Sequence, residues 1–133
     1  MGRIFETTSK IAPRMMLDSN ILIGYLNGDA AIIEKTQNWR SAGTVLFVSH
    51  VSVIEALSLP ALSVEQVIEI ERFLNDFIVI PIDMVISRKA AELRRLHALS
   101  VPDAVVAASA MVNRLRLVTR DKKLSKLFSA VLI

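Results

Sequence analysis

The sequence has 133 residues, a net charge of +3 at pH 7 and no cysteine. This length suits one domain with its own core, and the lack of cysteine excludes disulfides and thiolate zinc sites. No apolar run is long and uncharged enough for a membrane-spanning helix, and residues 1–14 lack the apolar core of a signal peptide. We therefore expect a cytoplasmic protein.

The charge is distributed unevenly along the chain. Residues 1–83 carry six Lys and Arg against ten Asp and Glu, a net charge of −4, and residues 84–133 carry ten against three, a net charge of +7. A basic half of this kind suits a polyanion such as nucleic acid. The alternative is a basic face that only keeps the protein soluble.

Short apolar runs alternate with helical patterns along the chain. In chain order we predict strand 15–17, helix 20–26, helix 29–41, strand 45–48, helix 52–58, helix 63–77, strand 77–80, helix 83–99, helix 101–115, strand 117–118 and strand 131–133. Asp29 and Ser63 are expected N-caps, and Pro102 lies near a helix start. Strands separated by helices favour a parallel sheet covered by helices on both faces.

The clearest helical pattern lies in residues 83–99, where Asp83 is an expected N-cap. Its apolar face is expected to hold Ile86, Ala90, Leu93 and either Leu96 or His97. We find neither a linker nor an internal repeat, so the economical prediction is a single domain over residues 14–133.

Acidic residues occur where a buried protein segment would not be expected to carry them. Asp18 follows the first predicted strand directly, and Asp121 follows the strand that ends near Thr119. Parallel sheets bind ligands beyond the carboxyl ends of their strands. Glu55 and Asp103 lie on helical segments with mostly apolar neighbours. A lone buried carboxylate is costly, so several that converge would be explained together by a divalent cation.

Each acid also has an ordinary structural explanation. Asp18 and Asp121 can each cap the helix that follows, and Glu55 can lie on an exposed stripe. Asp103 lies in a first helical turn, where the helix dipole favours an acid. A shared site accounts for all four at once. The two histidines have no spacing typical of a zinc site, and the chain has neither a glycine-rich phosphate loop nor a nucleophilic serine motif.

The segments "LDSNILIGYL", "VSVIEAL", "LRRLHALSVPDAVVAASA" and "LRLVTRDKKL" occur in an order and spacing that resembles PIN-domain ribonucleases, most closely the VapC-type toxins of toxin–antitoxin pairs. The resemblance spans roughly residues 14–125. Since the family usually starts close to its first strand, the resemblance implies that residues 1–13 are an N-terminal extension. The sequence departs from the family pattern at four positions, with Ser19 in place of Thr, Ser100 in place of Gly, Lys123 in place of an acid and Leu124 in place of an aromatic residue.

The resemblance implies a three-layer α/β/α fold with a central parallel sheet of about five strands. It implies a catalytic quartet of Asp18, Glu55, Asp103 and Asp121, of which Asp18, Asp103 and Asp121 would bind Mg²⁺ or Mn²⁺. Ser19, Asn20 and Thr119 would support this pocket. The expected activity is metal-dependent hydrolysis of RNA by a homodimeric toxin that a cognate antitoxin protein silences.

Basic residues close in sequence to these acids are candidates for binding the RNA phosphate backbone: Arg114, Arg116, Arg120, Lys122 and Lys123. A different class of function remains open, in which a PIN-like scaffold binds RNA or a protein without cutting. A phosphorylatable receiver domain is disfavoured because Asp18 has no acidic neighbour.

Overall fold

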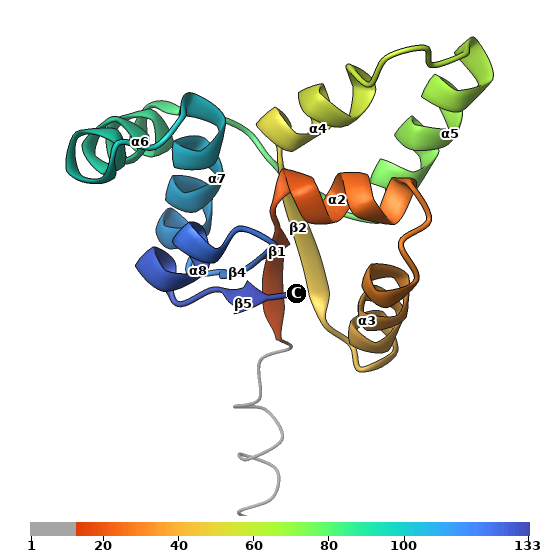
Figure 1. Cartoon of the computed structure of the whole chain (residues 1–133), viewed down its shortest axis with the longest axis horizontal. Coiled ribbons are helices and arrows are strands. Elements are labelled where there is room, and N and C mark those ends of the chain that lie inside the picture. The colour runs from red at the N-terminus through yellow and green to blue at the C-terminus, as the bar shows by residue number, and fades with distance from the viewer. Residues whose placement is uncertain (1–12) are drawn as a thin grey trace, which may run out of the picture.

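The computed structural model describes residues 13–133, so the predicted extension falls outside it except for Pro13. The described residues form one five-stranded parallel sheet in the order β3-β2-β1-β4-β5 (Figure 1). The strands are β1 (Arg14–Leu17), β2 (Val45–Ser49), β3 (Ile78–Ile80), β4 (Arg116–Thr119) and β5 (Val131–Leu132). All five predicted strands are confirmed, and no strand end differs by more than one residue.

The same residues contain seven helices. They are α2 (Ser19–Leu26), α3 (Ala30–Ser41), α4 (His50–Leu57), α5 (Val64–Leu74), α6 (Met84–His97), α7 (Val101–Val112) and α8 (Lys122–Phe128). The predictions carried α5 and α7 three residues too far, because each helix ends at an asparagine C-cap, Asn75 and Asn113. Among the described helices, none combines the length and hydrophobicity needed to cross a membrane.

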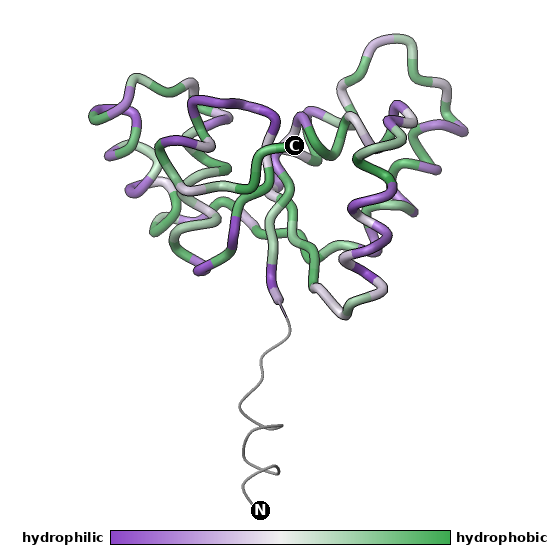
Figure 2. Tube along the Cα trace, turned by 60° about the horizontal axis from the view of Figure 1, so that its bottom comes forward, coloured by the Kyte–Doolittle hydropathy of each residue, from purple (hydrophilic) through white to green (hydrophobic). Residues whose placement is uncertain are grey.

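Helices cover both faces of the sheet, which confirms the three-layer α/β/α fold (Figure 1). α6, α7 and α8 pack on one face, and α2, α3, α4 and α5 pack on the other. β1 is the central strand and alternates between the two cores: Met16 points to the first, and Met15 and Leu17 point to the second. Hydrophobic residues accordingly follow the central strands (Figure 2).

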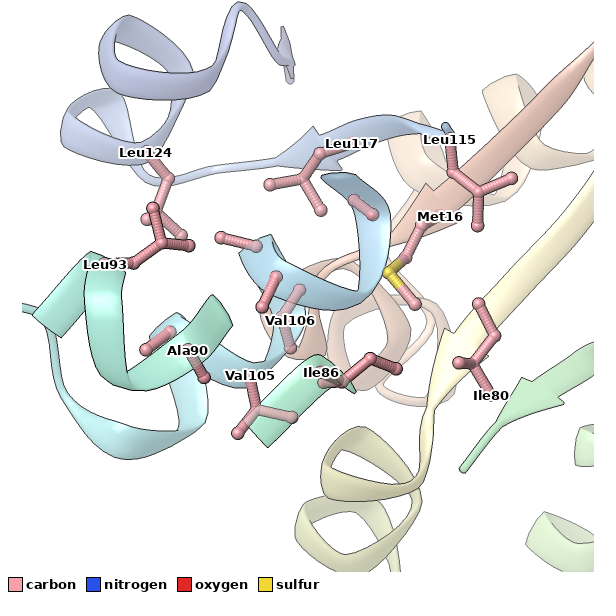
Figure 3. Close-up of a cluster of buried hydrophobic side chains, with 14 of the residues drawn as sticks. Met16, Ile80, Ile86, Ala90, Leu93, Val105, Val106, Leu115, Leu117 and Leu124 are labelled. Atoms are coloured by element: carbon pink, nitrogen blue, oxygen red, sulfur yellow. The ribbon is translucent and has the colours of Figure 1, made fainter. Parts of the chain in front are cut away.

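The core on the α6–α8 side holds α6 and α8 together. Leu124 of α8 is fully buried and meets Leu93 of α6, beside Leu117 of β4 (Figure 3). Of the two candidates for the last apolar position of α6, Leu96 is wrong, since it is 66% exposed. One residue turns the helix by about 100°. His97 therefore takes the inner position and packs edge-to-face on Phe128, with ring centroids 5.9 Å apart.

The order of the sheet creates a switch point between β1 and β4. β2 and β3 extend the sheet on one side of β1, and β4 and β5 extend it on the other. The chain that leaves β1 therefore covers one face and the chain that leaves β4 covers the other. Open parallel sheets bind ligands at the carboxyl ends of strands at such a point. Leu17 pairs with Val118, so the next residues, Asp18 and Thr119, meet there.

Candidate acidic site at the ends of β1 and β4

Asp18 occupies the switch point as a buried carboxylate. Its side chain and backbone together are only 3% exposed, and its backbone N–H donates to the Val118 carbonyl at 2.8 Å. One carboxylate oxygen, Oδ1, accepts from the Ser19 N–H at 2.8 Å, and the other, Oδ2, accepts from Thr119 Oγ1 at 2.6 Å. An N-cap side chain usually accepts from the second or third helical residue. Asp18 accepts from the first and from β4, so capping is only part of its role.

Thr119 connects the segments that surround this carboxylate. It is fully buried, and its Oγ1 accepts from the Asp121 N–H at 3.0 Å and from Asn20 Nδ2 at 3.4 Å. Asn20 Oδ1 in turn accepts from the Arg120 N–H at 3.2 Å. The structure thus brings Asn20 and Thr119 to Asp18, where the sequence predicted a supporting pocket.

The other acids of the predicted quartet come from three further helices. Asp121 is the N-cap of α8, and its Oδ1 accepts from the Lys123 and Leu124 N–H groups at 2.8 and 3.2 Å. Asp103 lies in the first turn of α7, where its N–H donates to the Ser100 side chain at 3.3 Å. Glu55 lies half-buried on α4. The ordinary structural explanations therefore hold for Asp121, which caps α8 with its side chain, and for Asp103, which lies in the first turn of α7.

The four carboxylates act on one another electrostatically. Burial raises the pKa of Asp18, hydrogen bonds from Thr119 and Ser19 oppose this, and the charges of Asp103 and Asp121 raise the pKa further. Burial also raises the pKa of Glu55, the Ser19 side chain opposes the rise, and the Asp103 charge adds to it. Like charges influence each other in this way only at short range. The pKa shifts thus link Asp18 to Asp103 and Asp121, and Glu55 to Asp103.

The donor chemistry of this cluster fits Mg²⁺ or Mn²⁺, because carboxylate and hydroxyl oxygens are the ligands such ions prefer. A bound cation would also relieve the repulsion that Asp103 and Asp121 exert on Asp18. Within residues 13–133, no three Asp, Glu or His side chains are arranged closely enough to hold an ion among them as they stand.

The predicted phosphate-binding residues fall into three separate places. Lys122 and Lys123 are exposed in the first turn of α8, beside Asp121. Arg116 begins β4 at its opposite end, about 10 Å along the strand from Thr119 at roughly 3.3 Å per residue, and Arg114 precedes the strand. The structure therefore places these two arginines away from the acids, although all of them are close in sequence, because the length of a strand separates them.

Arg120 is engaged in a way that sequence reasoning missed. Its guanidinium forms an ion pair with Asp29, the N-cap of α3, and this hydrogen bond is the main cause that lowers the pKa of Asp29. Gly24 of α2 lies close to this ion pair. A Cβ added to Gly24 would lie 2.5 Å from Ile32 Cδ1 and 3.6 Å from an Arg120 nitrogen. Nothing local in the sequence signals a pair separated by 91 residues.

Ser52 is a second site residue that sequence reasoning missed. It lies on α4 and is fully buried, and its Oγ is 2.8 Å from the Oγ of Ser19. The available signal was its position three residues before Glu55, which places both side chains on one face of a helix.

Comparisons with known proteins agree with this fold. A search of curated proteins finds no match. A chain of a toxin–antitoxin complex from Klebsiella pneumoniae is 26% identical, with a TM-score of 0.78 over 88% of this chain and 95% of that chain. A chain of VapBC2 from Rickettsia felis, bound to a promoter DNA fragment, is 19% identical, with a TM-score of 0.74 over 90% and 97% of the two chains. A chain of DNA-bound VapBC from Salmonella typhimurium is 17% identical, with a TM-score of 0.75 over 91% and 97%.

The family comparison covers almost the whole described fold. The model of the PIN domain matches residues 15–128, from β1 to the end of α8. The matched range includes Asp18, Glu55, Asp103 and Asp121, and the motif resemblance seen in the sequence is confirmed: the chain belongs to the PIN-domain family.

Proposed function

We propose that the protein is a metal-dependent endoribonuclease and the toxin of a toxin–antitoxin pair. The observation that carries this proposal is Asp18, a buried carboxylate at the switch point whose pKa is raised by burial and by the charges of Asp103 and Asp121. Membership in the PIN-domain family supports a nuclease. The likeness to a chain of the Klebsiella toxin–antitoxin complex supports a toxin with an antitoxin partner.

Asp18, Asp103 and Asp121 are the residues that would hold Mg²⁺ or Mn²⁺. When bound, such an ion supplies a positive charge that lowers the pKa of water and stabilises charge on the phosphate. Thr119 and the Ser19 N–H orient the Asp18 carboxylate for this task. Glu55 has a raised pKa, which suits a carboxyl that takes up and returns a proton during hydrolysis.

Asp18→Asn should leave the metal-free protein at least as stable as wild type. A raised folded-state pKa means that ionised Asp18 costs stability above that pKa, and that the cost vanishes below the unfolded value of 3.8. The advantage of the variant should therefore be largest near neutral pH and shrink on acidification, as measured by urea unfolding with EDTA.

The same measurement with metal provides the control. Mn²⁺ at a hundred times its dissociation constant should stabilise wild type by about 2.7 kcal/mol, and the variant much less. A variant that unfolds well below wild type in EDTA, yet gains as much from Mn²⁺, contradicts the metal site.

Asp18→Asn should reduce RNA cleavage by several orders of magnitude, because positioned charges supply most of the rate enhancement in such sites. Purified protein is incubated with total RNA, with and without Mg²⁺ or Mn²⁺. Asp83→Asn is the matched control, since Asp83 caps α6 through the Ile86 N–H and has no part in the proposed site. Wild-type protein that binds RNA but leaves every RNA class intact would instead favour the non-cutting scaffold.

Lys122 and Lys123 are proposed to contact the RNA phosphate backbone beside the acids. Replacing both by alanine should weaken RNA binding and lower its salt-dependence slope by up to about 1.4, at roughly 0.7 per phosphate contact in single strands. Fluorescence anisotropy across a salt series measures the slope. Replacing Arg114 and Arg116 removes the same charge at the other end of β4 and should change it little. An equal loss in both double variants rules out a local contact.

We further propose a homodimer formed through α4 and α5, with a groove for an antitoxin segment nearby. Ile54, Val64 and Ile68 on these helices are 60%, 74% and 42% exposed, which is apolar surface that a second copy can cover. Sedimentation velocity should show a dimer at high micromolar concentration, and Val64→Glu/Ile68→Glu should shift it to monomer. Wild-type protein that stays monomeric there overturns the dimer.

A further inference from the structure

A buried pair of hydroxyls joins the two helices that carry Asp18 and Glu55. Ser19 begins α2 directly after Asp18, and Ser52 lies on α4 one turn before Glu55. Their Oγ atoms are 2.8 Å apart, and the residues are only 7% and 0% exposed. α2 follows β1 and α4 follows β2, and this hydrogen bond lies where the two helices pack against each other.

The number of protons on this pair limits how it can be arranged. Each hydroxyl has one proton to donate, and a carboxylate can only accept. In the part of the chain that the structure describes, the bond between the two serines is the hydrogen bond found for the Ser52 side chain. The Ser19 side chain also acts on the Glu55 carboxylate, where it opposes the rise in pKa that burial causes. A Ser19 hydroxyl that donates to Glu55 leaves the Ser52 hydroxyl as the donor in the bond between the two serines.

We propose that Ser52 is a positioning residue for the acidic site: its hydroxyl donates to Ser19 Oγ and so holds the Ser19 hydroxyl in the orientation that donates to Glu55. This inference rests on the proposed nuclease function. We call this series of hydrogen bonds, from Ser52 to Ser19 and on to Glu55, the relay. Its two serines are buried, where a hydrogen bond is stronger than in water and a polar group left without a partner costs more free energy. Without Ser52, the Ser19 hydroxyl is free to rotate away, and Glu55 loses a fixed partner.

Ser52→Ala should lower kcat for RNA cleavage about tenfold, the size expected from one lost buried hydrogen bond, with KM changed less than about twofold. Ser52→Thr keeps the hydroxyl and should recover most of the rate. Ser109→Ala is the matched control, because Ser109 is also fully buried but donates to the Val105 carbonyl within α7 at 2.7 Å. Its kcat should equal that of wild type.

A double variant tests whether Ser52 acts through Ser19. Ser19→Ala/Ser52→Ala should be no slower than Ser19→Ala alone, since the second change removes a group whose partner is already gone. If the losses in kcat of the two single variants multiply in the double variant, the relay is overturned. A wild-type kcat in Ser52→Ala, or an equal loss of kcat in Ser109→Ala, overturns it as well. If Ser52→Ala does not fold, Ser52→Cys takes its place under the same criteria, because a thiol of similar size is only a weak donor.

A structural readout separates this inference from the proposed activity. In a crystal structure of Ser52→Ala, the Ser19 side chain should adopt a different rotamer, whereas Ser109→Ala should leave that rotamer unchanged. An unchanged Ser19 rotamer overturns the relay even if the protein is an active nuclease. Conversely, a wild-type protein that cuts no RNA refutes the proposed function while the rotamer still decides the relay.

Discussion

The hydrogen bond from Thr119 Oγ1 to Asp18 Oδ2 joins the carboxyl ends of the two central strands, and the candidate site is built around it. Both residues are buried, so neither finds water as an alternative partner. Burial drives Asp18 toward its neutral form, while this bond and the Ser19 N–H favour the charged form. Asp103 and Asp121 then add repulsion, which leaves a carboxylate whose charge any nearby cation would stabilise.

Helix capping and the candidate site use the same acids. Oδ1 of Asp121 accepts hydrogen bonds from two N–H groups of α8, and Oδ1 of Asp18 accepts one from the first N–H of α2. Capping fixes where each carboxyl group lies at little entropic cost, because the backbone is already ordered by the strands below. The ordinary explanation of each acid and the functional one are therefore compatible. A helix that begins at the end of a parallel strand places its cap where ligands bind.

The loop after β4 is held from two sides. Leu124 anchors α8 in the core beneath the sheet, and Arg120 reaches across to Asp29 at the start of α3. An exposed ion pair adds little to global stability, so its effect is on the local position of the loop between Thr119 and Asp121. Gly24 lets Arg120 and Ile32 approach α2 closely. Leu124, Arg120 and Gly24 thus help to hold the loop that carries Asp121 in place.

The sequence by itself determined the strands, the parallel three-layer fold and the order of the four acids, because apolar runs, caps and motif spacing are local signals. Tertiary structure alone decided which distant side chains touch. Ser19 meets Ser52 across 33 residues, and Arg120 meets Asp29 across 91. Arg116, by contrast, lies near Thr119 in sequence yet at the other end of β4. The physical reason is that a strand carries neighbours apart along its length, while packing of helices on a sheet brings remote residues together.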